Sequence, residues 1–193
     1  MHNRLLVFSR GIKHSRFNSR LLAAVLPLLA VVLVVLGPTG LSGAAEDDPL
    51  AQAREYIADE KYTEASDLLR TVTRKDDAPL EAWLLLGIAY EGQGLSSRAI
   101  TAYEEVMSRD KTHLDGGLGL GRNLMQNRSK RQQAMSLYKS LLKVYPDEPR
   151  LHFALGMAYN EMAEVSYAFE QYKMIKDTAP ELAQQLYDAI FLR

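Results

Sequence analysis

The chain has 193 residues, of which 47% are hydrophobic and 24% charged, the balance of a globular rather than a disordered protein. It has no cysteine, which excludes disulfide bonds, thiolate metal sites and cysteine catalysis. Residues 1–45 hold five basic residues and no acidic one, whereas the remainder holds 18 basic residues against 24 acidic ones. The excess of acidic residues after residue 45, called here the body of the chain, disfavours non-specific binding to nucleic acid, so no nucleic-acid partner is expected.

Residues 1–45 have the order of an export leader. A basic segment, residues 1–20, precedes an unbroken apolar run over residues 21–36, and small residues then surround possible cleavage sites after Ala44 and Ala45. The run is shorter than the roughly 20 residues that a bilayer core needs, although residues 21–45 carry no charge. A cleaved signal peptide and a membrane-inserted signal anchor therefore both stay open. Either would export the body, because the positive charges stay on the cytoplasmic side.

The rest of the chain repeats with a period of 34 or 35 residues, which is typical of stacked repeat architectures. Five sets of equivalent positions, called here registers, recur with this spacing. Small residues dominate two of the registers, and aromatic or aliphatic residues dominate the other three. They are Tyr56, Tyr90, Leu124 and Tyr159; Ala65, Ala99, Ala134 and Ala168; Leu69, Tyr103, Tyr138 and Tyr172; Val72, Val106, Leu141 and Ile175; and Ala53, Gly87, Gly121 and Gly156. A single extra residue falls between Leu124 and Ala134.

Within one repeat the spacing is helical. Trp83, Leu86, Gly87 and Tyr90 stand at i, i+3, i+4 and i+7, on one face of a helix. Residues 92–94 then break the pattern before a second helical segment, so each unit is expected to be a helix-turn-helix. The small residue at the Gly87 register allows two helix backbones to approach closely. Periodicity places Trp83 and the register tyrosines in the core.

The order W-x2-L-G-x2-Y over residues 83–90, then A-x3-Y and a proline at the end of the unit, resembles the tetratricopeptide repeat family. The resemblance implies an all-α fold, an α-solenoid of four helix-turn-helix repeats with a C-terminal capping helix, after an N-terminal signal or transmembrane helix. Repeats one and three depart from the pattern, with Pro49 and Gly117 at the tryptophan register. The expected domains are a leader at 1–45, repeats at 46–79, 80–113, 114–148 and 149–182, and a cap at 181–193.

The resemblance also implies a concave groove lined by the first helix of each repeat. Counting from the small-residue register places eleven side chains in this peptide-binding groove. They are Arg54, Ile57, Leu84, Ile88, Glu91, Leu118, Arg122, Met125, Phe153, Met157 and Asn160. Such a mixture favours an extended or helical apolar partner segment that bears a few charges. The alternative is that many of these side chains pack between neighbouring helices.

Some proteins of this family grip a C-terminal carboxylate with lysine and asparagine side chains. The corresponding positions here are apolar: Leu50, Leu84, Leu118 and Phe153. A carboxylate clamp is therefore not expected.

The glycine-rich segment 116–121 does not fit a phosphate-binding loop, because Arg122 stands where the last glycine would fall and no strand precedes it. No cofactor is expected. Gly121 is explained by its small-residue register. Gly116, Gly117 and Gly119 have no such explanation, and each is expected to weaken the helix by about 1 kcal/mol relative to alanine.

Catalytic and metal-binding patterns are absent from the sequence. The four histidines, at positions 2, 14, 113 and 152, lack the spacing of metal ligands, and the paired acidic residues coincide with inter-repeat turns. No serine stands in a nucleophile motif. Asn127 begins a glycosylation sequon, which matters only in a eukaryotic secretory protein.

These features together predict a non-enzymatic scaffold or adaptor that binds a protein segment in its groove. Its expected place is the periplasm, or the inner membrane with the repeats outside the cytoplasm, in bacterial cell-envelope assembly, secretion or pilus-type machinery. A structural protein that forms homo-oligomers through its solenoid ends, and a membrane-anchored adaptor, are the alternatives.

Overall fold

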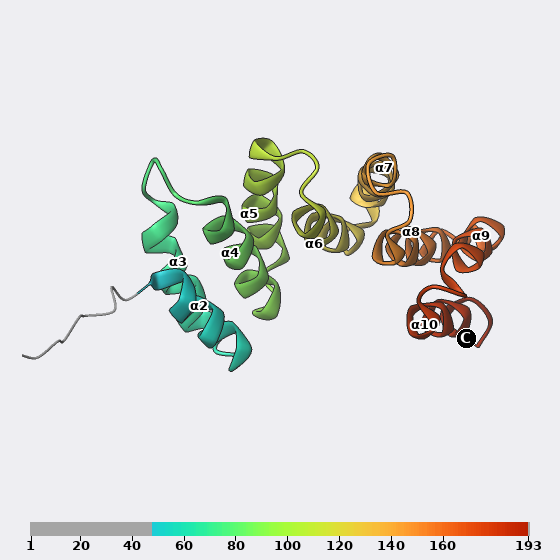
Figure 1. Cartoon of the computed structure of the whole chain (residues 1–193), viewed down its shortest axis with the longest axis horizontal. Coiled ribbons are helices and arrows are strands. Elements are labelled where there is room, and N and C mark those ends of the chain that lie inside the picture. The colour runs from blue at the N-terminus through green and yellow to red at the C-terminus, as the bar shows by residue number, and fades with distance from the viewer. Residues whose placement is uncertain (1–47, 193) are drawn as a thin grey trace, which may run out of the picture. The chain divides into compact units, whose positions relative to one another are not determined.

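The computed structural model describes residues 48–192, and every regular element in this range is helical (Figure 1). The expected leader at residues 1–45 lies outside the described residues. Within residues 48–192, no helix is both long and apolar enough to cross a membrane.

Nine α-helices and one 3-10 turn follow one another along the described part of the chain. Their bounds are α2 (Pro49–Ala58), α3 (Tyr62–Thr73), α4 (Leu80–Gly92), α5 (Ser96–Arg109), α6 (Leu114–Met125), η1 (Arg128–Lys130), α7 (Arg131–Leu142), α8 (Pro149–Glu161), α9 (Val165–Ile175) and α10 (Pro180–Phe191). Each helix packs against the next, and α2, α4, α6, α8 and α10 also pack in series. The predicted fold class, an α-solenoid of four helical hairpins and a last helix, is confirmed for these residues (Figure 1).

Two of the first helices begin at an acidic capping residue. The Asp48 carboxylate accepts a hydrogen bond from the Leu50 amide at 2.9 Å, and the Glu148 carboxylate accepts one from the Arg150 amide at 3.2 Å. In both α2 and α8 a proline follows at the first helical position. His113 caps α6 instead, because its Nδ1 accepts from the Gly116 amide at 3.1 Å.

The turns within repeats one, two and four share one geometry. A residue with positive φ ends the first helix: Glu60 at 58°, Gly94 at 71° and Ala163 at 62°. The next amide donates back to the carbonyl of the register tyrosine, as when Leu95 donates to Tyr90 at 2.9 Å. Repeat three carries the extra residue and forms η1 in place of this turn.

The repeat registers form the core. The four register alanines, Ala65, Ala99, Ala134 and Ala168, have no exposed surface, and the register glycines are buried as well. A continuous apolar cluster runs through repeats one to four, and a smaller one beneath α10 contains Ile175, Ala183 and Leu186. Each hairpin therefore completes its core by stacking on its neighbour.

The glycines of α6 correct one expectation. A Cβ at Gly116 would lie 2.6 Å from Val106 Cγ1, one at Gly117 would meet Leu141, and one at Gly119 would lie 2.7 Å from Tyr103 Cε1. These distances are too short for any real Cβ atom. Gly116 and Gly119 are therefore required by the close approach of α5, just as Gly121 is required by Tyr138, whereas a side chain at Gly117 would displace only the end of the Leu141 side chain of α7.

We expect Gly119→Ala to lower the free energy of unfolding by about 2 kcal/mol, because the added methyl group collides with the buried Tyr103 ring. In a helix without this contact, replacing glycine by alanine would raise the free energy of unfolding by about 1 kcal/mol. Urea denaturation measures the difference. Ser136→Ala, on the exposed side of α7, is the control and should not destabilise. A more stable Gly119→Ala variant would contradict the packing described here.

Candidate functional site

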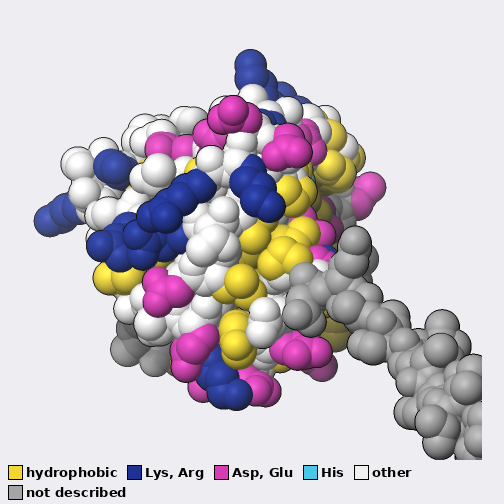
Figure 2. All heavy atoms as spheres, turned by 90° about the vertical axis from the view of Figure 1, so that its left-hand side faces the viewer, with side chains coloured by type: hydrophobic (Ala, Val, Ile, Leu, Met, Phe, Trp, Pro, Cys, Tyr) yellow, Lys and Arg dark blue, Asp and Glu magenta, His cyan; other side chains and the backbone are white. Residues whose placement is uncertain are grey.

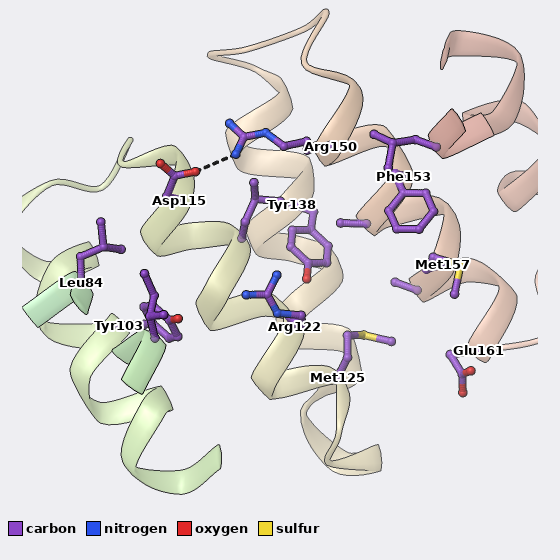
Figure 3. A pocket seen from close by; sticks show the side chains of 15 residues that line it. Leu84, Tyr103, Asp115, Arg122, Met125, Tyr138, Arg150, Phe153, Met157 and Glu161 are labelled. Atoms are coloured by element: carbon purple, nitrogen blue, oxygen red, sulfur yellow. Dashed lines mark hydrogen bonds and ion pairs between the residues drawn. The ribbon is translucent and has the colours of Figure 1, made fainter. Parts of the chain in front are cut away.

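A cavity of about 650 Å³, called here the first-helix cavity, opens along the first helices of repeats two, three and four (Figure 3). Its wall contains seven of the eleven residues predicted for the groove. They are Leu84, Ile88, Leu118, Arg122, Met125, Phe153 and Met157.

Helical spacing places these side chains on one wall. Leu84 and Ile88 lie four residues apart on α4, as do Leu118 and Arg122 on α6, and residues at this spacing share a helix face. In Figure 3, Phe153 and Met157 of α8 lie across the cavity from Leu84. The wall is mainly aliphatic, aromatic and thioether in character.

Four predicted residues do not line this cavity. Arg54 is exposed on α2 and donates to Glu81 through Nε at 2.9 Å and Nη2 at 2.7 Å. Ile57 packs against the apolar core, and Glu91 pairs with Arg122. Asn160 is buried, and its Nδ2 donates to the Ala189 carbonyl at 2.9 Å. Its side chain therefore fastens α10 instead of facing the groove.

Eight further residues that the groove prediction omitted also line the cavity. They are Tyr103, Asp115, Tyr138, Arg150, Ala154, Ala158, Glu161 and Leu182. Tyr103 and Tyr138 come from second helices and belong to a register that was assigned to the core. They are buried, but their rings cross the small residues Gly87 and Gly121 and reach the wall of the cavity. The sequence did hold a signal for this placement, because a tyrosine register is paired with a glycine register, and a ring can extend across a residue that has no side chain.

An ion pair beside the cavity joins repeats two and three. The Arg122 guanidinium contacts the Glu91 carboxylate with both Nε and Nη2, the latter at 2.9 Å, and the Tyr103 hydroxyl donates to Glu91 Oε2 at 2.9 Å. Burial raises the pKa of Glu91, but the hydrogen bonds and charge of Arg122 outweigh it, so that pKa lies below its ordinary value. The pKa of Tyr103 is raised, chiefly by burial and then by the Glu91 charge.

A second ion pair lies at the rim, where Arg150 of α8 contacts Asp115 of α6 at 2.8 Å (Figure 3). Arg150 also donates to Glu148 at 2.9 Å, and this bond contributes most to raising the pKa of its guanidinium. At the other end, Arg131 lies 3.4 Å from Glu161. The cavity is thus an apolar surface with paired charges at its edges.

Within residues 48–192, no group of three histidine, aspartate or glutamate side chains gathers in a way that could hold a metal ion. His152 is buried, and its Nε2 donates to the Pro146 carbonyl at 2.8 Å. His113 caps a helix. His2 and His14 lie outside the described residues.

Glu91→Gln should lower the free energy of unfolding by about 1 kcal/mol at pH 7, because it removes the charged acceptor of the Arg122 hydrogen bonds. The effect is modest because the Arg122 side chain is exposed to solvent. The pKa of Glu91 is depressed in the folded chain, so its ionised form stabilises the fold above the unfolded-state pKa. This stabilisation is lost as the pH falls through the folded-state pKa.

Denaturation of both proteins between pH 7 and pH 3 should therefore show a difference in stability that narrows as the pH falls below the ordinary glutamate pKa of about 4.3. Glu104→Gln, an exposed glutamate of α5, is the control. A Glu91→Gln deficit that stays constant over this range would show that the charge is not responsible.

Known proteins were compared with the chain. Two family models described as tetratricopeptide repeat match residues 50–111 and 115–148. The chain is 26% identical over 144 residues to the CTR9 homolog protein of Arabidopsis thaliana, covering 65% of this chain and 13% of that protein. It therefore spans about an eighth of that relative's length.

Two solved structures show the same fold. MamA of Desulfovibrio magneticus RS-1 has a TM-score of 0.62 at 20% identity, over 75% of this chain and 85% of that one. A thermophilic tetratricopeptide repeat protein of Thermus thermophilus has a TM-score of 0.63 at 21% identity, over 76% and 79%. With its five repeat registers, its stacked helical hairpins and the two family models that match it, the chain belongs to the tetratricopeptide repeat family.

Proposed function

We propose that this chain is a non-enzymatic scaffold that holds a segment of a partner protein in the first-helix cavity. Tetratricopeptide repeat proteins are protein-interaction scaffolds and are typically non-catalytic. The observation that carries the proposal is a cavity of about 650 Å³, built from three consecutive repeats and apolar over most of its wall. A cavity of this size and character is the usual form of a binding site.

The chemistry of the wall defines the partner segment. Leu84, Phe153 and Met157 offer apolar surface, and burial of such surface contributes about 25 cal/mol per Å² before the cost of ordering the segment. Methionine adapts its shape to different side chains. Asp115 and Arg150 at the rim can exchange their mutual contact for charges on the segment. The best fit is an extended or helical apolar segment that carries a few charges.

The scaffold acts outside the cytoplasm, in cell-envelope assembly, secretion or pilus-type machinery. What supports this location is the sequence of residues 1–45, in which five basic residues precede an uncharged apolar run. The body after this segment is acidic and lacks cysteine, which fits an exported protein without disulfide bonds.

A photocrosslinking amino acid at Phe153, inside the cavity, should capture a partner in the cells that produce the protein. The same amino acid at Tyr167, an aromatic side chain that is 59% exposed outside the cavity, should not. Adding Leu84→Glu and Met157→Glu should reduce capture at Phe153 by about tenfold or more, because two unpaired carboxylates would be desolvated on binding. Crosslinked bands on a denaturing gel, identified by mass spectrometry, give the measurement.

The pair Gln133→Glu and Ser140→Glu, which adds the same charge at exposed positions of α7, is the matched control and should leave capture unchanged. Equal capture by the native and Leu84/Met157 proteins would place recognition elsewhere. A product that consists of two copies of this chain would instead identify the self-assembling structural protein.

The N-terminus of the mature protein tests the location. We expect sequencing of protein purified from its own cells to begin at Ala45 or Glu46, because small residues precede both positions at the required spacing. An intact N-terminus in the membrane fraction would identify the anchored form. An intact N-terminus in the cytoplasmic fraction would contradict export.

A further inference from the structure

A second cavity, of about 670 Å³, lies between the second helices of repeats one and two and is called here the arginine cavity. Both α3 and α5 pack against α4 but not against each other, and the cavity occupies the space between them. It shares no residue with the first-helix cavity. Its wall consists of Arg70, Thr73, Arg74, Trp83, Leu86, Tyr90, Ser97, Arg98, Thr101 and Ala102.

The charge of this wall is entirely positive. It contains three arginines and no carboxylate, although the chain after residue 45 is acidic overall. Arg70 has one exposed ion pair, with Asp67 at 3.4 Å, and neither Arg74 nor Arg98 forms an ion pair within residues 48–192. In the first-helix cavity, by contrast, Arg122 and Arg150 are both paired. Figure 2, which faces the end formed by α2 and α3, shows Lys and Arg side chains gathered on part of that surface.

Aromatic rings of α4 hold arginines in place. The Arg98 guanidinium lies 5.7 Å from the Tyr90 ring centroid, and Arg109, just outside the cavity, lies 5.8 Å from the Trp83 ring centroid. Arg109 also donates to the Ala78 carbonyl at 2.7 Å. The buried Trp83 Nε1 has no hydrogen-bond acceptor within the described residues. The site therefore has an excess of donors.

One side of the cavity is apolar. Trp83, Leu86 and Tyr90 stand at i, i+3 and i+7 on α4 and form a strip along that helix. Arg70 lies on α3 and Arg74 directly follows that helix, whereas Arg98 lies on α5, so positive charge is supplied from both sides of the strip.

We propose that the arginine cavity binds an acidic peptide segment in which carboxylates flank an apolar side chain. The carboxylates supply the negative charge and the acceptors that the wall lacks, and guanidinium groups bind carboxylates well. The apolar side chain covers the strip of α4. A small anion such as phosphate would neutralise the arginines but would leave this strip uncovered, so the peptide fits better. The site adds a second, charge-selective surface to the scaffold.

Trp83 makes the site directly observable, because it is the single tryptophan of the whole chain and lines the cavity. The full-length protein is titrated with a capped five-residue peptide that has a leucine between two pairs of glutamates. We expect a saturable change in tryptophan fluorescence that weakens as salt is added. The same peptide with glutamines in place of the glutamates should bind about tenfold more weakly or not at all.

Arg74→Gln combined with Arg98→Gln should weaken binding of the acidic peptide by about fivefold to tenfold, since both residues are exposed. Arg128→Gln removes an exposed arginine that lies outside the cavity and has no ion pair with the residues that the structure describes, and it should leave affinity unchanged. Circular dichroism melting curves check that each variant is folded.

Three results would overturn the proposal. The first is no saturable change up to about 5 mM acidic peptide, which corresponds to a free energy too small for recognition. The second is equal affinity for the glutamate and glutamine peptides, or for the native and Arg74/Arg98 proteins. The third is a saturable change with inorganic phosphate that the acidic peptide does not compete away, which would assign the cavity to a phosphate ligand.

Discussion

The spacing between neighbouring helices depends on tyrosine rings that lie against glycine backbones. Tyr103 fills the space above Gly87 and also meets Gly119 of the next repeat, and Tyr138 fills the space above Gly121. A single methyl group at these glycines would need the space that the ring occupies. Since each hairpin can bury its apolar face only on its neighbour, these contacts determine both the stacking of the repeats and the shape of the cavity beside them. The same rings reach into the cavity, so core and binding surface share side chains.

Periodicity was sufficient to predict the fold, because five registers in step can be satisfied together only by stacked hairpins. It also placed seven of the fifteen residues of the cavity wall, since side chains four residues apart share a helix face. It did not place Asn160, whose amide bonds to the Ala189 carbonyl across the chain, nor Arg54, which pairs with Glu81. Such contacts join residues nearly thirty positions apart and depend on how side chains meet after stacking. The glycines of α6 show the same limit, because their partners come from α5 and α7.

The two cavities differ in how their charges are used. In the first-helix cavity, Arg122 and Arg150 are neutralised by carboxylates of neighbouring helices, so the net surface offered to a partner is largely apolar. In the arginine cavity, Arg74 and Arg98 have no carboxylate partner among residues 48–192, so their charge is available to a ligand. The first surface would select by shape and the second by charge. A scaffold with both could hold two unlike segments at once, since no wall residue is common to them.

Leu182 connects the first-helix cavity with α10. It lies on α10, lines the first-helix cavity and packs on the small apolar cluster around Leu186, together with Phe153 and Met157. Within residues 48–192, α10 packs against α8 and α9 alone, so its docking depends on these two contacts. A guest seated against Leu182 would hold α10 in place, and local opening of α10 would remove one wall of the site. Occupancy of the cavity and the docking of α10 are thus thermodynamically linked.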